Sequence, residues 1–216
     1  MMRLRSLVAV AFASIAFAGV AVAQAPSGLD SATLAAIAPI VERARAANLP
    51  LNLLYTRARQ GQVQRLPTAK IEAAVRKFAE RLEMAHSALA PNPTAQELTG
   101  AVDALQSGVP RETLVEMRRA AKDGSLAVPL AVLTQLVARG VPVEQASVKV
   151  VDLLQRGAGA VHFIALDDRV RADVLAGKRP DESLDLRLKG IFPNLPQAVD
   201  ALDATNLQNA GTKRPR

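Results

Sequence analysis

Apolar residues recur with a helical period along nearly the whole chain. The clearest stripe begins after Pro67 and joins, at steps of four and three residues, Ile71, Val75, Phe78, Leu82, Ala85 and Leu89. This spacing places the side chains on one face of a helix. Shorter stripes of the same kind begin at Leu34 and Val143. The pattern predicts an all-α protein with essentially no sheet.

Proline and glycine predict where the helices begin and end. Proline suits the first turn of a helix, where its missing N–H is not needed, and glycine accepts the left-handed conformation that closes a helix. A branched apolar residue precedes proline at Leu49-Pro50, Leu66-Pro67, Val109-Pro110, Val128-Pro129 and Val141-Pro142. The glycines expected at helix ends are Gly61, Gly108, Gly124, Gly140, Gly157 and Gly177. Thr94 and Glu97 have the spacing of a capping box.

Two segments, 50–82 and 129–157, share this punctuation and predict an internal repeat of a helical hairpin. In each, the first proline is followed by glycine after 11 residues, and apolar residues lie 4, 8 and 11 positions after the second proline. Aligned in this way, the first segment has four extra turn residues, 62–65. Hairpins of this size stack into solenoids, although two copies also fit a compact bundle. The alternative to a duplication is shared punctuation.

The predicted fold is an all-α compact or solenoid-like array of short helical hairpins over residues 24–190. Its expected core includes Leu54, Ile71, Val75, Phe78, Leu82, Leu133, Leu136, Val150 and Leu153. The end of the chain departs from this pattern. Leu184, Leu186 and Leu188 alternate with charged residues, which fits either a short strand or an irregular helix. Residues 191–216 are expected to form an irregular or disordered tail.

The first 23 residues have the order of a signal peptide. Arg3 and Arg5 precede a short apolar run, and Ala21-Val22-Ala23 matches an A-x-A cleavage signal. The run is shorter than the roughly 20 residues of a comfortable membrane span. We therefore expect cleavage between Ala23 and Gln24 and a periplasmic or secreted protein, with an uncleaved anchor as the alternative. No later run is long enough to span a membrane.

Positive charge is concentrated in one part of a chain whose formal net charge is +7. Between Arg43 and Arg81, nine basic residues face two acidic ones. The candidate ligand-binding residues are Arg57, Arg59, Arg65, Lys70, Lys77 and Arg81. Such a surface attracts anionic partners, which for an exported protein are acidic lipids, polysaccharides or acidic protein surfaces. The alternative is an ordinary solvated face that Glu72 and Glu80 partly neutralise.

The sequence contains no recognisable catalytic, metal or cofactor signature. It has no cysteine and two histidines, and neither G-x-S-x-G nor a glycine-rich phosphate loop occurs. Glu83 and His86 supply only half of a di-iron motif. His162 cannot share a helix face with Asp167 or Asp168, because offsets of five and six residues rotate away from it. The few aromatic rings and the expected export argue against nucleic acid.

Three functions remain open from the sequence. The leading hypothesis is an exported, non-enzymatic helical interaction or scaffold protein of a bacterial-type envelope, whose partner is another envelope protein. The second is a protein that binds an anionic envelope ligand, an acidic lipid or polysaccharide, through residues 57–81. The third is a hydrolase whose site has no recognisable motif. A salt-sensitive interaction with anionic ligands distinguishes the second from the first.

Overall fold

The computed structural model describes residues 28–122 and 124–195, and all regular secondary structure in them is helical. The all-α prediction is therefore confirmed. The helices are α1 (Ser31–Ala46), α2 (Leu51–Val63), α3 (Thr68–Ala88), α4 (Ala95–Gln106), α5 (Arg111–Ala121), α6 (Ala127–Ala138), α7 (Val143–Gln155), α8 (Ala160–Leu175), α9 (Pro180–Ile191) and the 3-10 helix η1 (Phe192–Asn194). The signal-peptide segment, 1–23, lies outside the described residues.

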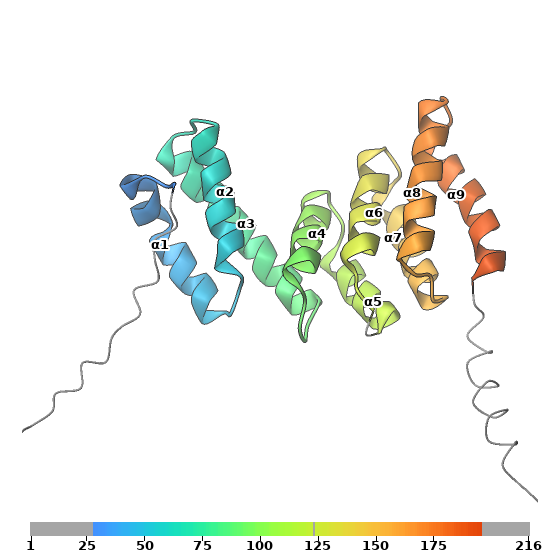
Figure 1. The fold of residues 1–216 in the computed structure, drawn as a ribbon, viewed down its shortest axis with the longest axis horizontal. Coiled ribbons are helices and arrows are strands. Elements are labelled where there is room, and N and C mark those ends of the chain that lie inside the picture. Colours follow the sequence, from blue (N-terminus) through green and yellow to red (C-terminus); the bar gives the residue numbers. More distant parts are fainter. Residues whose placement is uncertain (1–27, 123, 196–216) are drawn as a thin grey trace, which may run out of the picture.

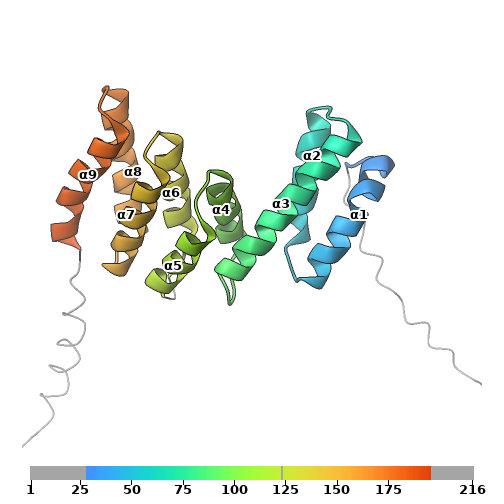
Figure 2. The same cartoon turned by 180° about the vertical axis from the view of Figure 1, so that it is seen from behind.

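The helices form a two-layer array, as expected for stacked hairpins (Figure 1). In one layer α4 packs on α6 and α6 on α8, and in the other α3 packs on α5 and α5 on α7. The layers are joined within hairpins by the pairs α2–α3, α6–α7 and α8–α9. Figure 2 shows the second layer from its own side, with α1 beside α3 at one end and α9 at the other. The core is the continuous apolar zone between the two layers.

The hairpin turns have a common geometry. The connectors of the α2–α3, α4–α5, α6–α7 and α8–α9 hairpins each have four residues, and in each the second residue has a positive φ: Arg65 (55°), Gly108 (91°), Gly140 (97°) and Gly177 (86°). The next residue donates its N–H to a carbonyl five positions earlier, as in Leu66 to Gly61 and Val141 to Leu136, at 3.0 and 3.1 Å. This closure satisfies carbonyls that the helix end leaves free.

The shared turn sets a register between the two predicted repeat segments that differs from the expected one. The first helices end at Val63 and Ala138 and the second helices begin at Thr68 and Val143, so both boundaries of the turn recur after 75 residues. The longer turn predicted at residues 62–65 is therefore wrong. The helix pairs match without a gap, and their origin by duplication stays a prediction.

Two local features explain this correction. Gly61 lies inside α2 and does not end it. In the turn after α2, Arg65 has the left-handed conformation that Gly140 has in the turn after α6. Pro50 is the N-cap of α2, whereas Pro129 lies within the first turn of α6. Both prolines are tolerated, because neither position needs an N–H for the helix. The equal proline-to-glycine spacing in the sequence therefore aligned Pro50 with Pro129 and Gly61 with Gly140, although these residues occupy different positions in their helices.

The expected core is confirmed except at Phe78. The other eight expected core residues are buried, but Phe78 is only partly buried against the edge of the core. At 100° per residue, Phe78 lies on the same face of α3 as the buried residues Ile71 and Ala85. The helical period alone therefore does not account for its partial exposure. Val75 and Val150 have the equivalent burial expected of a repeat, whereas Phe78 and Leu153 do not.

The ambiguous C-terminal segment is helical. Leu184 and Leu188 face the core from α9, while Leu186 is exposed, as a helical period requires. Burial of Ile191 and Leu195 carries the packed chain through η1, beyond the expected boundary at residue 190. The rest of the predicted tail, 196–216, lies outside the described residues.

Candidate functional site

A cleft lies over the middle of α3, between α2 and α4. At 21 residues, α3 is the longest helix that the structure describes, whereas α7 has 13. At 1.5 Å per residue this difference is about 12 Å. It helps to separate α2 from α4, which do not pack extensively, unlike α4 with α6 and α6 with α8. Figure 1 shows α2 and α4 standing apart, with α3 running behind them.

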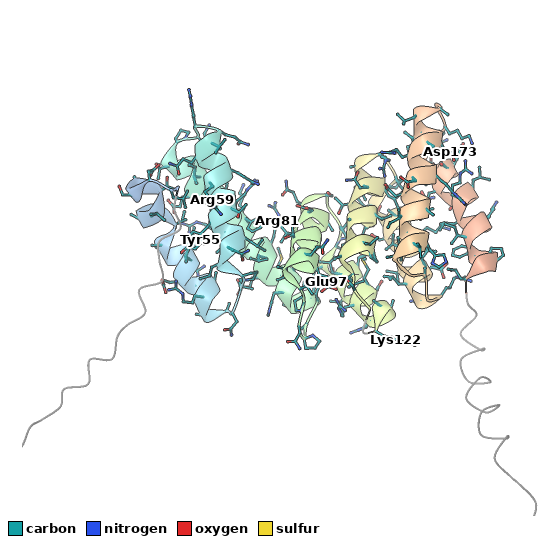
Figure 3. The ribbon with its side chains drawn as sticks, in the orientation of Figure 1. Tyr55, Arg59, Arg81, Glu97, Lys122 and Asp173 are labelled. Atoms are coloured by element: carbon teal, nitrogen blue, oxygen red, sulfur yellow. The ribbon has the colours of Figure 1, made fainter. Side chains whose placement is uncertain are left out.

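Basic side chains line this cleft, which has a volume of about 320 Å³. Its lining residues are Arg57 from α2, Lys70, Ala73, Ala74, Lys77 and Arg81 from α3, and Gln106 from α4. The structure thus brings together four of the six candidate ligand-binding residues. We call Arg57, Lys70, Lys77 and Arg81 the basic cluster. Figure 3 marks Arg81 where α3 approaches α4.

Helix geometry explains which candidates line the cleft and which do not. Residues seven and four positions apart share a helix face, which aligns Lys70, Lys77 and Arg81 on α3. Arg59 is two positions from Arg57, so it projects about 200° around α2 and donates instead to the hydroxyl of Thr56 at 3.3 Å. Arg65 is exposed in the α2–α3 turn and does not line the cleft.

The basic cluster is not neutralised by the described carboxylates. None of its four members forms an ion pair within the described part of the chain, and Arg57 donates to the side-chain amide oxygen of Gln60 at 3.3 Å. On another face of α3, Arg76 does pair with Glu72. The cluster therefore presents to the cleft positive charge that is not engaged in ion pairs with the described residues.

One nearby carboxylate interacts with this charge. Partial loss of hydration raises the pKa of Asp103 on α4 above its ordinary value, although this residue is exposed, while the positive charge of Arg57 opposes the rise. The direction shows that loss of hydration outweighs the attraction from Arg57. Asp103 still lowers the positive potential at this edge of the cleft when it is ionised. The cleft is therefore most strongly basic along α3 itself.

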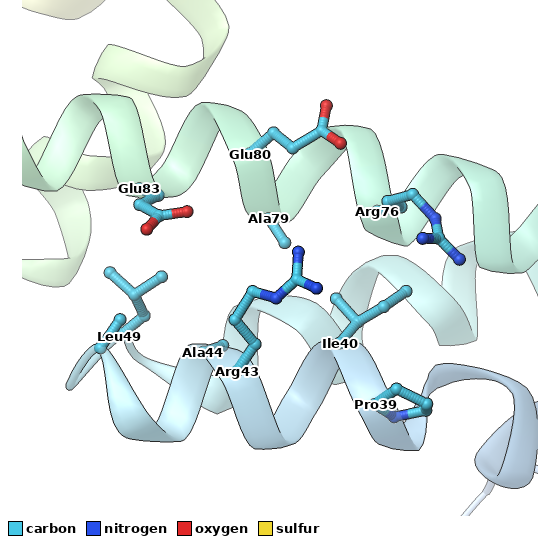
Figure 4. Close-up of a pocket in the computed structure, with 10 residues that line it drawn as sticks. Pro39, Ile40, Arg43, Ala44, Leu49, Arg76, Ala79, Glu80 and Glu83 are labelled. Carbon is cyan, nitrogen blue, oxygen red and sulfur yellow. The ribbon is translucent and has the colours of Figure 1, made fainter.

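Other hollows carry weaker chemical arguments. The pocket between α1 and α3 is small, about 60 Å³, and mixes Arg43 and Arg76 with Glu80 and Glu83 (Figure 4). A groove on α6 and α8 is lined by Asp167 and Asp168, of which Asp167 accepts hydrogen bonds from the Arg139 guanidinium and Asp168 forms an ion pair with Arg171. The first hollow thus mixes both signs of charge, and the carboxylates of the second are already paired.

The structure also assigns local roles to candidate metal-binding residues. The Nδ1 of His162 accepts a hydrogen bond from the backbone N–H of Gly159 at 3.1 Å, which caps α8. Among residues 28–122 and 124–195, no group of three histidine, cysteine or carboxylate side chains is arranged to hold a metal ion. Within the same residues, no helix is both long and apolar enough to cross a membrane.

The sequence placed Glu97 of α4 in a capping box but did not predict that its carboxylate is buried. Glu97, only 3% exposed, accepts hydrogen bonds at 2.7 Å from both the backbone N–H of Leu126 and the guanidinium of Arg118. It also accepts from the backbone N–H of Thr94 at 2.8 Å, which completes the predicted capping box. Burial raises the pKa of Glu97, but these hydrogen bonds outweigh burial and hold it below the ordinary value. Glu97 thus ties α4 to α5 and to the start of α6.

A second buried carboxylate lies near the C-terminal end of the array. The carboxylate of Asp173 on α8 accepts two hydrogen bonds from Arg187 at 2.7 Å, and one each from Ser183 and Lys178 at 2.8 and 2.9 Å. The hydrogen bonds from Arg187, followed by those from Lys178 and Ser183, hold the pKa of Asp173 far below its usual range. Asp173 is a structural anchor between α8 and α9.

The hairpin register supplies a signal for both carboxylates. Arg118 and Arg187 lie eight positions after their N-caps, where the other two hairpins have the buried residues Val75 and Val150. An arginine at a core position needs a carboxylate partner nearby. Recognition of all four hairpins in the sequence therefore marks Arg118 and Arg187 as residues that need an acidic partner, without identifying which carboxylate it is.

Comparisons with protein-family models, curated proteins and solved structures gave no match. The function must therefore be argued from the geometry of this chain.

Proposed function

We propose that this chain is an exported, non-enzymatic helical interaction protein of the envelope, which binds an anionic partner in the cleft between α2, α3 and α4. The observation that supports this proposal is the basic cluster: four cations from two helices line one cleft without forming an ion pair among the described residues. Clustered charge of one sign in a concave site focuses the electrostatic potential and attracts the opposite charge. Export is inferred from the A-x-A signal that ends at Ala23.

A matched pair of variants tests whether the cleft, rather than total charge, is responsible. Lys77→Gln with Arg81→Gln removes two charges from the basic cluster. Arg59→Gln with Arg65→Gln removes two charges from exposed sites outside the cleft. Both double variants therefore have the same net charge.

The measurement is elution of the mature protein from an immobilised anionic polymer in a salt gradient. We expect the cleft variant to elute at clearly lower salt than the wild type, and the control variant to elute close to it, because clustered charges act together on one ligand. Circular dichroism checks that both variants keep the helical fold. If the two variants elute at the same salt concentration, net charge alone drives retention and the proposal is wrong.

A further inference from the structure

The arrangement of the basic cluster also bears on the shape of its ligand. Lys70, Lys77 and Arg81 follow one another along α3, about 10 and then about 6 Å apart along the helix axis. The row therefore extends over about 16 Å, and Arg57 faces it from α2. A single compact anion cannot contact a row of this length.

The walls of the cleft disfavour a flat ligand. Arg57 comes from α2 and Gln106 from α4, so side chains of two further helices border the cations of α3 in the cleft. A planar lipid surface meets the rims of such a cleft before its floor. A flexible chain can instead lie between the walls and follow the axis of α3.

The floor and the lining residues favour charge recognition over apolar docking. Ala73 and Ala74 are the only apolar residues that line the cleft. Their small side chains let a chain approach the helix backbone but offer little area to an apolar protein surface, which usually needs large anchor residues in a pocket. No aromatic ring lines the cleft, so stacking on sugar rings or bases contributes nothing there. The Gln106 amide remains to hydrogen-bond a polar group of the ligand.

We infer that the cleft binds a linear polyanion, laid along α3, whose successive anionic groups contact Lys70, Lys77 and Arg81. This inference rests on the proposed function and specifies its ligand class. The shared chemistry is a flexible chain with repeated negative charges, which both a phosphate polymer and a carboxylated polysaccharide possess. Binding releases counterions from the polymer, so it weakens steeply with salt.

Titration calorimetry of the mature protein with two length series tests this inference. One series is orthophosphate, tripolyphosphate and long-chain polyphosphate, and the other is galacturonic acid and its oligomers, with an uncharged oligosaccharide as control. We expect affinity to rise with length until the chain covers the row and then to level off. The stronger series identifies the charged group. Three or four contacts predict a slope of log affinity against log salt of about −2 to −3.

The same two double variants separate the inference from the proposed function. Lys77→Gln with Arg81→Gln should reduce long-chain affinity about tenfold and roughly halve the salt slope, whereas Arg59→Gln with Arg65→Gln should change neither appreciably. If orthophosphate binds as tightly as long chains, or if anionic vesicles bind through the cleft while chains do not, the polyanion inference fails and the anionic cleft stands. If no anionic probe distinguishes the cleft variant from the control variant, both fail.

Discussion

Glu97→Ala tests whether a buried charge organises the middle of the array. The substitution leaves the guanidinium of Arg118, whose side chain is 18% exposed, without its carboxylate, and it removes the acceptor of the buried Leu126 N–H. Breaking a buried ion pair from one side costs about 3–5 kcal/mol, and a buried donor without a partner costs about 1–3 kcal/mol. Since the two costs overlap and the site relaxes, we expect a loss of about 4 kcal/mol in the free energy of unfolding.

The appropriate assay is urea unfolding followed by helical circular dichroism at neutral pH. Glu42→Ala is the matched control, because Glu42 pairs with Arg45 at the surface, where both side chains are exposed. Such a pair contributes at most about 1 kcal/mol. A loss below about 1 kcal/mol for Glu97→Ala, close to that of the control, would refute the view that this carboxylate holds α4, α5 and α6 together.

A double variant that replaces both members of the Glu97–Arg118 pair tests whether the two positions are core sites that also accept apolar residues. Glu97→Leu with Arg118→Val gives this hairpin the residues found at the corresponding positions of the first hairpin, Leu54 and Val75. Replacing both members of a buried pair by apolar residues is often neutral, although the Leu126 N–H still loses its acceptor. We expect the double variant to be more stable than either single replacement. If it is less stable than both, the two positions are not equivalent core sites.

The pH dependence of the Glu97→Ala effect follows from the direction of the Glu97 pKa. The folded protein holds this pKa below its ordinary value, so ionised Glu97 stabilises the fold above the unfolded pKa. This contribution is lost as the pH falls through the lowered folded value. The difference in unfolding free energy between wild type and Glu97→Ala should therefore shrink in acid. A difference that grows as the pH falls would contradict this assignment.

Two further predictions concern the core and the cleft. Phe78→Ala should lower the free energy of unfolding in urea by about 2 kcal/mol, which is less than the loss of about 3–5 kcal/mol expected for a fully buried ring. The loss should also be smaller than that of Leu54→Ala, because Leu54 is 0% exposed. A larger loss for Phe78→Ala than for Leu54→Ala would place the ring in the core. Asp103→Asn should strengthen polyanion binding in calorimetry, because it removes a negative charge that interacts with Arg57, and unchanged or weaker binding would show that Asp103 does not influence the cleft.

Much of the candidate site could be predicted, because the face of a helix on which a residue lies depends only on sequence spacing within that helix. The spacing of Lys70, Lys77 and Arg81 already placed them on one side of a helix. Arg59 and Arg65 were included because they are neighbours in sequence, although α2 turns the first away and the α2–α3 connector holds the second. The cleft itself depends on the separation of α2 and α4, which no local pattern reports.

The sequence by itself determined the helical class, most core positions and the capping box at Thr94, since each depends on residues within a few turns of one another. Only the tertiary structure decided the hairpin register, because Arg65 takes a left-handed conformation usually signalled by glycine. It also decided that Glu97 meets Arg118 and the Leu126 N–H across three helices. Such pairings depend on packing between distant segments, and they determine which charges are buried and which remain available to a ligand.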